Sequence, residues 1–256
     1  MLLFNLTLLS FLLLTTAKRI PPNLRSFYHT VRHAGNCTGS DLLKGGFYDQ
    51  DDSLPLWGYC QRYITGRGLY LKGPDHALAN MDIDCDGLKV PGDGRCNNSR
   101  DTQYETAFKE DVRKFGIPDL NPYVHPYVVL GNVGRYTPTF DPRSVGVRPL
   151  SVVAVVCANK LIYGIWGDVN GDDGLPLVGE ASLALATACF GHRMNGDNGH
   201  DAPDVLYLAF AGDEAVPGYR AKWHAKGYKD FERSIERLGD RLVARVGASR
   251  PDHTDL

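Results

Sequence analysis

Short apolar runs are the feature that most limits what this chain can fold into. Residues 127–130, 150–158, 161–166 and 205–210 are rich in Val, Tyr and Leu, and runs of this kind are typical of buried strands. Asn159-Lys160 separates two of them and predicts a tight hairpin. Because the runs do not alternate regularly with helical segments, a βαβ arrangement is excluded and a mostly β, α+β domain is favoured.

Three segments have the spacing of helices. Residues 102–115 place apolar side chains on one face, and Thr102 and Glu105 have the spacing of a capping box. Residues 179–190 are rich in Ala and Leu and end at Gly191, so we expect a helix there that begins around Glu180. Near the C-terminus, apolar residues repeat as in an amphipathic helix, at Phe231, Ile235, Leu238, Leu242 and Val246.

Composition excludes several classes of protein. Of the 256 residues, 43% are hydrophobic and 23% are charged, which is ordinary for a globular domain and excludes intrinsic disorder, collagen and coiled coil. No internal repeat or change of composition divides the chain, so we expect one domain over residues 26–247 and a polar tail over 248–256. The net charge of −2 gives no positive field for nucleic acid or an anionic membrane, and we expect neither partner. A monomer is the expected state.

The first 17 residues predict a secretory signal peptide. They are apolar and uncharged, and Thr15 and Ala17 suit the small-residue positions of a cleavage site. An N-terminal membrane anchor is the alternative. Lys18-Arg19 follows directly, so residues 18–25 form a candidate pro-segment. No later run reaches about 20 apolar residues, and we expect the mature protein to be secreted and extracellular.

Six cysteines lie behind this segment, at positions 37, 60, 85, 96, 157 and 189. In an oxidising compartment an even set predicts up to three disulfides, with about 15 ways of pairing them. No Cys-x-x-Cys spacing supports a zinc or redox site. Serine-hydrolase, P-loop and zinc-protease motifs are also missing from the sequence. We therefore expect no metal and no cofactor.

Acidic residues are concentrated in one part of the chain. Between positions 164 and 214 there are nine acidic residues and one Lys or Arg, a local charge of −8, whereas residues 215–256 carry nine basic and six acidic residues, or +3. Clustered carboxylates repel one another unless a metal, a cationic partner or a catalytic role offsets the cost. A solvated acidic face is the ordinary alternative.

One acidic group occupies residues 82–93. Asp82, Asp84, Asp86, Gly87 and Asp93 match positions of a calcium-binding loop. Pro91 and Gly92, however, would interrupt the helix that normally follows such a loop. A short strand explains the same spacing, because alternate residues of a strand point to one face.

A second acidic group occupies residues 166–182. Asp168 and Asp172 with Asn170 resemble a second calcium loop, but the glycine and the terminal acid are one position late. The other interpretation is a catalytic pair. Asp168 at the end of a hydrophobic run would have a raised pKa and act as general acid, while Glu180 at a helix start would act as general base. Trp166 is a candidate sugar-stacking platform or a core residue.

Several motifs, taken in order, resemble one family, the fungal chitosanases of glycoside hydrolase family 75. They are Tyr70-Leu71-Lys72-Gly73, Asn80-Met81-Asp82-Ile83-Asp84-Cys85-Asp86-Gly87, Asp101-Thr102-Gln103, His125-Pro126-Tyr127-Val128-Val129, residues 149–157, Tyr163-Gly164-Ile165-Trp166-Gly167-Asp168, Gly179-Glu180-Ala181-Ser182, Gly199-His200-Asp201 and Ala215-Val216-Pro217-Gly218. Together they span about residues 35–246, which is most of the mature chain.

The resemblance implies an endo-acting, inverting hydrolase of chitosan, a β-1,4-linked glucosamine polymer. It places the catalytic Asp and Glu on Asp168 and Glu180, with Asp172 or Asp173 as alternatives to Asp168. Substrate-binding residues are expected at Asp82, Asp84, Asp86, Trp166, Asp172, Asp173, His200 and Asp201. Chitosan is a polycation, so an acidic cleft suits it. By analogy with other small inverting endoglycosidases, the domain is expected to be centred on a β-barrel, with a double-psi barrel as its specific form.

Two other hypotheses remain at this point. The acidic groups fit a calcium-dependent secreted glycan-binding module, which would bind without turnover. The catalytic pair fits equally an inverting glycosidase that acts on a neutral or N-acetylated glycan.

Overall fold

The computed structural model describes residues 18–50, 54–64, 67–99, 103–135, 137–171 and 174–247. Within them, nine strands form one sheet: β1 Leu42–Phe47, β2 Trp57–Cys60, β3 Gly68–Lys72, β4 Ala79–Asp84, β5 Tyr127–Asn132, β6 Val152–Cys157, β7 Lys160–Asn170, β8 Glu180–Ser182 and β9 His200–Phe210. The helices are α1 Pro22–His33, α2 Lys109–Arg113, α3 Leu183–Phe190 and α4 Tyr228–Val243, with short 3-10 turns at Gly39–Asp41, Pro142–Val145, Asp213–Ala215 and Gly218–Arg220. The predicted signal peptide and polar tail lie outside the described residues, as do Asp172 and Asp173.

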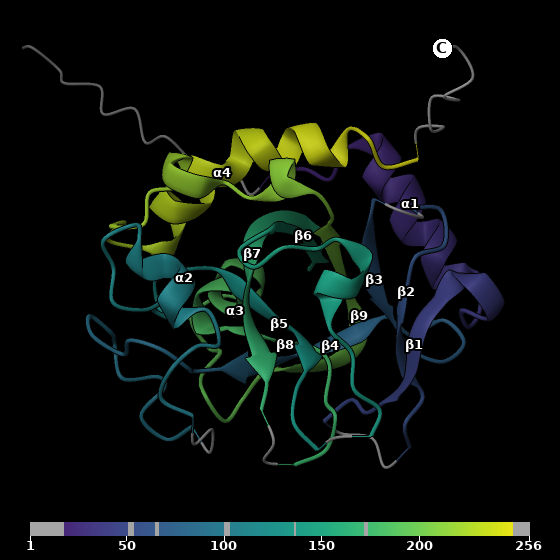
Figure 1. The fold of residues 1–256 in the computed structure, drawn as a ribbon, viewed down its shortest axis with the longest axis horizontal. Coiled ribbons are helices and arrows are strands. Elements are labelled where there is room, and N and C mark those ends of the chain that lie inside the picture. The colour runs from purple at the N-terminus through teal and green to yellow at the C-terminus, as the bar shows by residue number, and fades with distance from the viewer. Residues whose placement is uncertain are drawn as a thin grey trace, which may run out of the picture.

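Six strands of the sheet close on themselves. The order is β1-β2-β3-β9-β4-β8-β5-β7-β6, and β6 also pairs with β9, so β9, β4, β8, β5, β7 and β6 form a ring (Figure 1). In this ring β4 pairs with β8 and β5 pairs with β7 in parallel, and the other strand pairs are antiparallel. β1, β2 and β3 extend from β9 as an antiparallel flank. A mostly β fold with a few helices is therefore confirmed.

The predicted apolar runs form strands because nearly every side chain in them is buried. β5 and β6 are buried at every position, and β7 at most of its eleven. The expected hairpin joins β6 to β7, where Cys157 pairs with Lys160 and the two turn residues, Ala158 and Asn159, both have positive φ. Such left-handed turns match the twist of paired strands.

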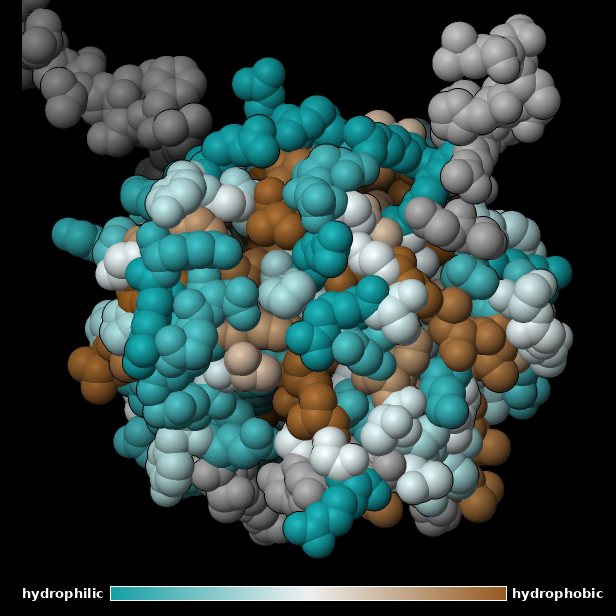
Figure 2. All heavy atoms as spheres, viewed as in Figure 1, coloured by the Kyte–Doolittle hydropathy of each residue, from teal (hydrophilic) through white to brown (hydrophobic). Residues whose placement is uncertain are grey.

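Helices cover the outside of the ring. α4 packs its apolar face against β6 and β7, as its spacing predicted, while its outer face presents hydrophilic side chains (Figures 1 and 2). α1 buries Leu24, Phe27 and Val31. Lys18, which precedes α1 in the chain, also contacts the domain. Its carbonyl oxygen accepts a hydrogen bond from Leu161 N–H, and the Lys18 ammonium forms an ion pair with Glu236 at 2.6 Å. Residues 18–25 are thus packed on the domain, and their removal as a pro-segment stays a prediction.

Two helix predictions are wrong in part. Residues 103–108 are not helical, and α2 spans only Lys109–Arg113. The reason is that buried acids bind this stretch: Asp119 accepts from Thr106, and Asp168 accepts from Ala107 N–H. Glu180 does not begin a helix either. It begins the strand β8, and α3 starts at Leu183, capped by the hydroxyl of Ser182.

All six cysteines are paired, as predicted. The bonds are Cys37–Cys60, Cys85–Cys96 and Cys157–Cys189. The second holds the chain directly after β4, and the third joins the end of β6 to α3. No helix in the described part of the chain has the length and apolar character needed to cross a membrane.

Candidate active site

Carboxyl groups from three strands meet in one polar pocket. It is lined by Asp84, Asp86, Gln103, Val129, Asp168, Val169, Asn170 and Glu180. None of these described lining residues is basic. The pocket unites the two acidic groups of the sequence, which are about 80 positions apart, because β4, β8, β5 and β7 are consecutive neighbours in the ring. Asp168 and Glu180, the predicted catalytic pair, therefore face the same space.

Asp168 is fixed firmly in this pocket. It lies in β7, is 3% exposed, and its Oδ1 accepts hydrogen bonds from Ala107 N–H at 2.8 Å and Val169 N–H at 2.7 Å. Gly167 before it allows the close approach of β7 to β5, since a Cβ there would lie 2.5 Å from that of Tyr127. The Trp-Gly-Asp motif thus places a carboxyl group at a defined point and with a defined orientation.

Trp166 occupies the core. It is 1% exposed, and its indole nitrogen lies 2.9 Å from the carbonyl oxygen of Leu130 and 2.8 Å from that of Asp168. Its ring meets Phe108 edge-on. A sugar ring has no access to it, so the expected stacking platform is replaced by the alternative, a core tryptophan that orders the backbone beside Asp168.

Glu180 is half-buried at the start of β8. Gly179 before it has φ +98° and packs so tightly on Asn80 that a Cβ would lie 2.1 Å from the amide oxygen, so only glycine fits. Two residues later, the Ser182 hydroxyl accepts from Tyr127 N–H at 2.9 Å and donates to the carbonyl of His125. The Gly-Glu-Ala-Ser motif therefore anchors the Glu180 strand between β4 and β5.

Asp82 lies beside Glu180. The two residues are register partners of the parallel strands β4 and β8. The Asp82 carboxylate accepts from the amide of Asn80 at 2.8 Å, and the amide of Gln50 can donate to both its oxygens. Burial raises the pKa of Tyr207 well above its usual range, and the charges of Asp82, Glu180 and Asp49 raise it further. This tyrosine therefore remains a neutral hydrogen-bond donor behind the site.

Asp84 and Asp86 face Asp168. All three residues are at most 4% exposed, and one carboxylate oxygen from each lies within 4.8 Å of the others. Asp84 Oδ1 accepts from Asp86 N–H at 2.6 Å, and the hydroxyl of Tyr127 lies 3.1 Å from it. Tyr127 and Gln103 belong to the site although no role had been predicted for them. Asn170, considered only as part of a calcium loop, also lines the pocket.

The calcium-loop interpretation of residues 82–93 does not fit the structure. Asp82 and Asp84 lie in β4, as the alternative predicted, with their side chains on one face of the strand. Asp93 is bound instead by Arg95, whose Nε lies 3.0 and 2.9 Å from its two oxygens. The five residues therefore do not surround one point.

His200 and Asp201 lie at the start of β9, outside the lining of the acidic pocket. The His200 ring stacks on Phe190 with centroids 4.0 Å apart, and its Nε2 lies 2.9 Å from Asp204. Asp201 is exposed. A substrate chain would have to extend beyond the pocket to reach them.

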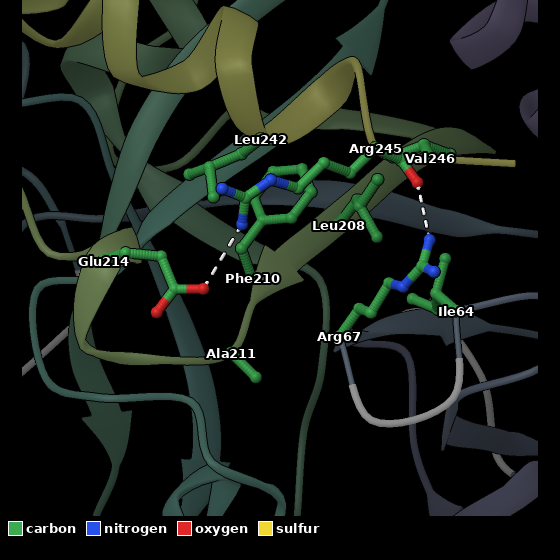
Figure 3. Close-up of a pocket in the computed structure, with 9 residues that line it drawn as sticks. All are labelled: Ile64, Arg67, Leu208, Phe210, Ala211, Glu214, Leu242, Arg245 and Val246. Atoms are coloured by element: carbon green, nitrogen blue, oxygen red, sulfur yellow. Dashed lines mark hydrogen bonds and ion pairs between the residues drawn. The ribbon is translucent and has the colours of Figure 1, made fainter. Parts of the chain in front are cut away.

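A second pocket lies between β9, the end of α4 and the loop that precedes β3 (Figure 3). Its floor is apolar, with Leu208, Phe210 and Leu242, and an ion pair between Arg245 and Glu214 crosses its rim at 3.2 Å. None of the predicted site residues lies in it. The acidic pocket is therefore the one that carries the expected chemistry.

A polar pocket with several carboxyl groups is the kind of site that glycoside hydrolases use, where one carboxyl group donates a proton and another accepts one. The sequence profile of the fungal chitosanases of glycosyl hydrolase group 75 matches residues 81–245. An endo-chitosanase of Aspergillus fumigatus is 46% identical over 91% of this chain and 94% of its own length. Endo-chitosanase B of Aspergillus oryzae is 44% identical over the same shares. Endo-chitosanase C of Aspergillus oryzae is 35% identical over 66% of this chain and 39% of its own length.

The chain belongs to the fungal chitosanases of glycosyl hydrolase group 75. The family resemblance seen in the ordered motifs is thereby confirmed. Membership makes this protein a glycoside hydrolase, and the calcium-dependent binding module is not needed to explain its acidic groups.

Proposed function

We propose that this chain is a secreted endo-chitosanase that hydrolyses β-1,4 bonds between glucosamine units with inversion. The observation that supports the proposal most directly is the acidic pocket, in which Asp168 and Glu180 face one space together with Asp84 and Asp86. Such a pocket attracts the ammonium groups of chitosan. The names of the relatives, all endo-chitosanases, point to the same polymer.

Asp168 is the proposed general acid. It is the more buried of the two catalytic carboxyl groups, and burial favours the protonated form. Because its Oδ1 already accepts two backbone N–H groups, the proton belongs on Oδ2. From there it passes to the glycosidic oxygen as the bond from that oxygen to C1 breaks.

Glu180 is the proposed general base. It is half-buried, so its carboxylate keeps contact with solvent and with an attacking water. It takes one proton from this water while the water oxygen forms the new bond to C1 on the opposite face of the sugar. The products are a reducing sugar of inverted configuration and a shortened chain. Solvent then returns a proton to Asp168 and takes one from Glu180.

The wider predictions have their own support. Secretion is supported by the uncharged apolar leader and by three disulfides, which persist in oxidising compartments. A double-psi β-barrel is supported by the closed ring of six strands with its two parallel pairs.

Conservative replacement of the two carboxyl groups tests the mechanism. Asp168→Asn and Glu180→Gln are each expected to lower depolymerisation of chitosan by about 100-fold or more, with melting temperatures close to that of the wild type. Asp197→Asn, which changes an exposed acid in the same acidic segment, is the matched control and keeps full activity. Retention of activity in both site variants would overturn the assignment.

The substrate is tested separately. Initial rates on chitosan of graded acetylation, and on cellulose, distinguish the proposed polymer from a neutral or N-acetylated glycan. We expect the rate to fall as acetylation rises, and to fall with added salt, because both remove attraction between ammonium groups and the acidic pocket. A rate that rises with acetylation favours the other glycan.

A further inference from the structure

The proposed mechanism uses two carboxyl groups, but the pocket contains two more that are buried deeply. Asp84, Asp86 and Asp168 are 4%, 3% and 3% exposed, and their nearest oxygens are within 4.8 Å of one another. Removing like charges from water at this spacing raises the free energy of the fully ionised state. Groups coupled in this way retain a proton at pH values where a lone carboxyl group has lost it.

The hydrogen bonds show that both Asp168 and Asp84 can carry the negative charge of the pair. Asp168 and Asp84 each turn one oxygen toward donors: Asp168 Oδ1 to two backbone N–H groups, and Asp84 Oδ1 to Asp86 N–H and the Tyr127 hydroxyl. Two donors on each residue support a negative charge on either one. The two carboxyl groups thus have similar hydrogen-bond donors, so we infer that their proton affinities are similar.

The Tyr127 hydroxyl can form a hydrogen bond with Asp84 in both protonation states of that carboxyl group. Its hydroxyl lies 3.1 Å from Asp84 Oδ1 and 2.9 Å from the carbonyl oxygen of Asp86. Burial, together with the charges of Asp84, Asp168 and Asp86, raises its pKa well above its usual range, so it keeps its proton. It donates to Asp84 when Asp84 is ionised; when Asp84 is neutral, it can accept from Asp84 and donate to the Asp86 carbonyl.

We propose that Asp84 and Asp168 share one proton in the free enzyme, and that Tyr127 is the positioning residue that keeps Asp84 within reach. This rests on the proposed role of Asp168 as general acid. The sharing keeps Asp168 able to donate at a pH where it would otherwise be ionised. After the shared proton passes to the leaving oxygen, both carboxyl groups are ionised until one proton returns from solvent.

The described carboxyl groups around the pair act in the same direction. Asp86 lies beside the pair, Glu180 lines the pocket from β8, and Asp82 lies next to Glu180 on β4. Asp119 accepts hydrogen bonds from Thr106, which precedes Ala107, the residue whose N–H donates to Asp168. Burial raises the pKa of Asp119, although these hydrogen bonds and the charge of Lys109 lower it. Apart from Lys109, these groups are acidic, and each carboxylate opposes ionisation of the pair.

The sharing is measurable without any substrate. In the intact protein, carbon-13 NMR follows each aspartate carboxyl group through a pH titration, and the Asp168→Asn variant identifies the Asp168 signal. In Asp84→Asn, which removes one charge, we expect the Asp168 step to move to lower pH by about one unit or more. An Asp168 titration that is unchanged in Asp84→Asn overturns the proposal.

The pH dependence of kcat/KM on chitosan gives a second readout, and we expect it to change differently in two variants. In Asp84→Asn the basic limb of the kcat/KM profile should move to lower pH, because Asp168 ionises more easily. In Tyr127→Phe ionised Asp84 loses a donor and holds the proton more tightly. The plateau should then fall several-fold without a downward shift of the basic limb.

Tyr163→Phe is the matched control. Its hydroxyl also donates to an aspartate, Asp240 at 2.8 Å, but on the side of β7 that packs against α4. A merely structural role for Tyr127 would give the same profile as this control, with only a lower melting temperature, and would overturn the proposal. If Asp168→Asn stays active while the NMR coupling is present, the general-acid assignment fails but the shared proton stands.

Discussion

Asp82 and Glu180 are direct register partners on the parallel strands β4 and β8, so two carboxyl groups lie side by side on one face of the sheet. The negative charge of Asp82 opposes ionisation of Glu180, the proposed base. We predict that Asp82→Asn moves the acidic limb of the kcat/KM profile to lower pH by about one unit. Asp197→Asn, an exposed change, should leave the limb in place. A limb that moves to higher pH in Asp82→Asn would contradict the assignment of Glu180 as base.

Cys85 lies between Asp84 and Asp86, so its disulfide to Cys96 holds the acidic pocket directly. Replacing both cysteines by serine should cost about 3 kcal/mol of unfolding free energy, and should lower kcat by more than the fraction unfolded explains. Removing Cys157–Cys189, which lies outside the pocket, should cost a similar free energy with kcat of the folded protein unchanged. Denaturant melts and active-site titration together separate the two effects; equal losses of kcat would contradict the prediction.

Glu232 on α4 makes stability depend on pH. Burial raises its pKa to about 7, from 4.5 for an ordinary glutamate, with a smaller contribution from Glu236 and in opposition to the hydrogen bond from Tyr163 N–H. Because the folded state holds the proton more tightly, its contribution to stability is full below pH 4.5 and is lost as the pH rises through about 7. In Glu232→Gln we expect the melting temperature to fall less over this range. Glu110→Gln, an exposed control, should behave as the wild type.

His125 has the opposite effect at lower pH. It is 3% exposed, accepts from Asn121 N–H, and lies 2.9 Å from the carbonyl oxygen of Trp223. Burial lowers its pKa from 6.5 to about 4, against this hydrogen bond. The unfolded state therefore binds a proton that the folded state does not, and stability falls as the pH drops from 6.5 through about 4. His125→Gln should be less stable at pH 7 but should show a flatter acid limb in calorimetry. The exposed His192→Gln keeps the wild-type slope.

The strands of the ring could be predicted from sequence because their composition is local. β5, β6, β7 and β9 are apolar runs that read as strands without any partner. β8 could not, because its three residues precede an Ala- and Leu-rich helix and owe their extended form to pairing with β4 and β5. At Glu180, pairing with neighbouring strands therefore produces a strand although the sequence pattern predicts a helix.

The proposed catalytic pair could be located through family motifs, but its surroundings could not. Asp168 and Glu180 came from the Trp-Gly-Asp and Gly-Glu-Ala-Ser motifs, and the structure places both in one pocket. The approach of Asp84 to Asp168 depends on the pairing of β4, β8, β5 and β7, which joins segments about 80 residues apart. No local pattern contains that information, so Tyr127 was missed, and the sequence left Trp166 open between a sugar platform and a core residue.

Because Asp84, Asp168 and Glu180 come from three strands that lie far apart in the sequence, the site exists only when β4, β8, β5 and β7 are paired. A chain that has formed its helices and hairpins, but not these pairings, does not hold the acids together. Catalytic competence is therefore an all-or-none property of the folded molecule.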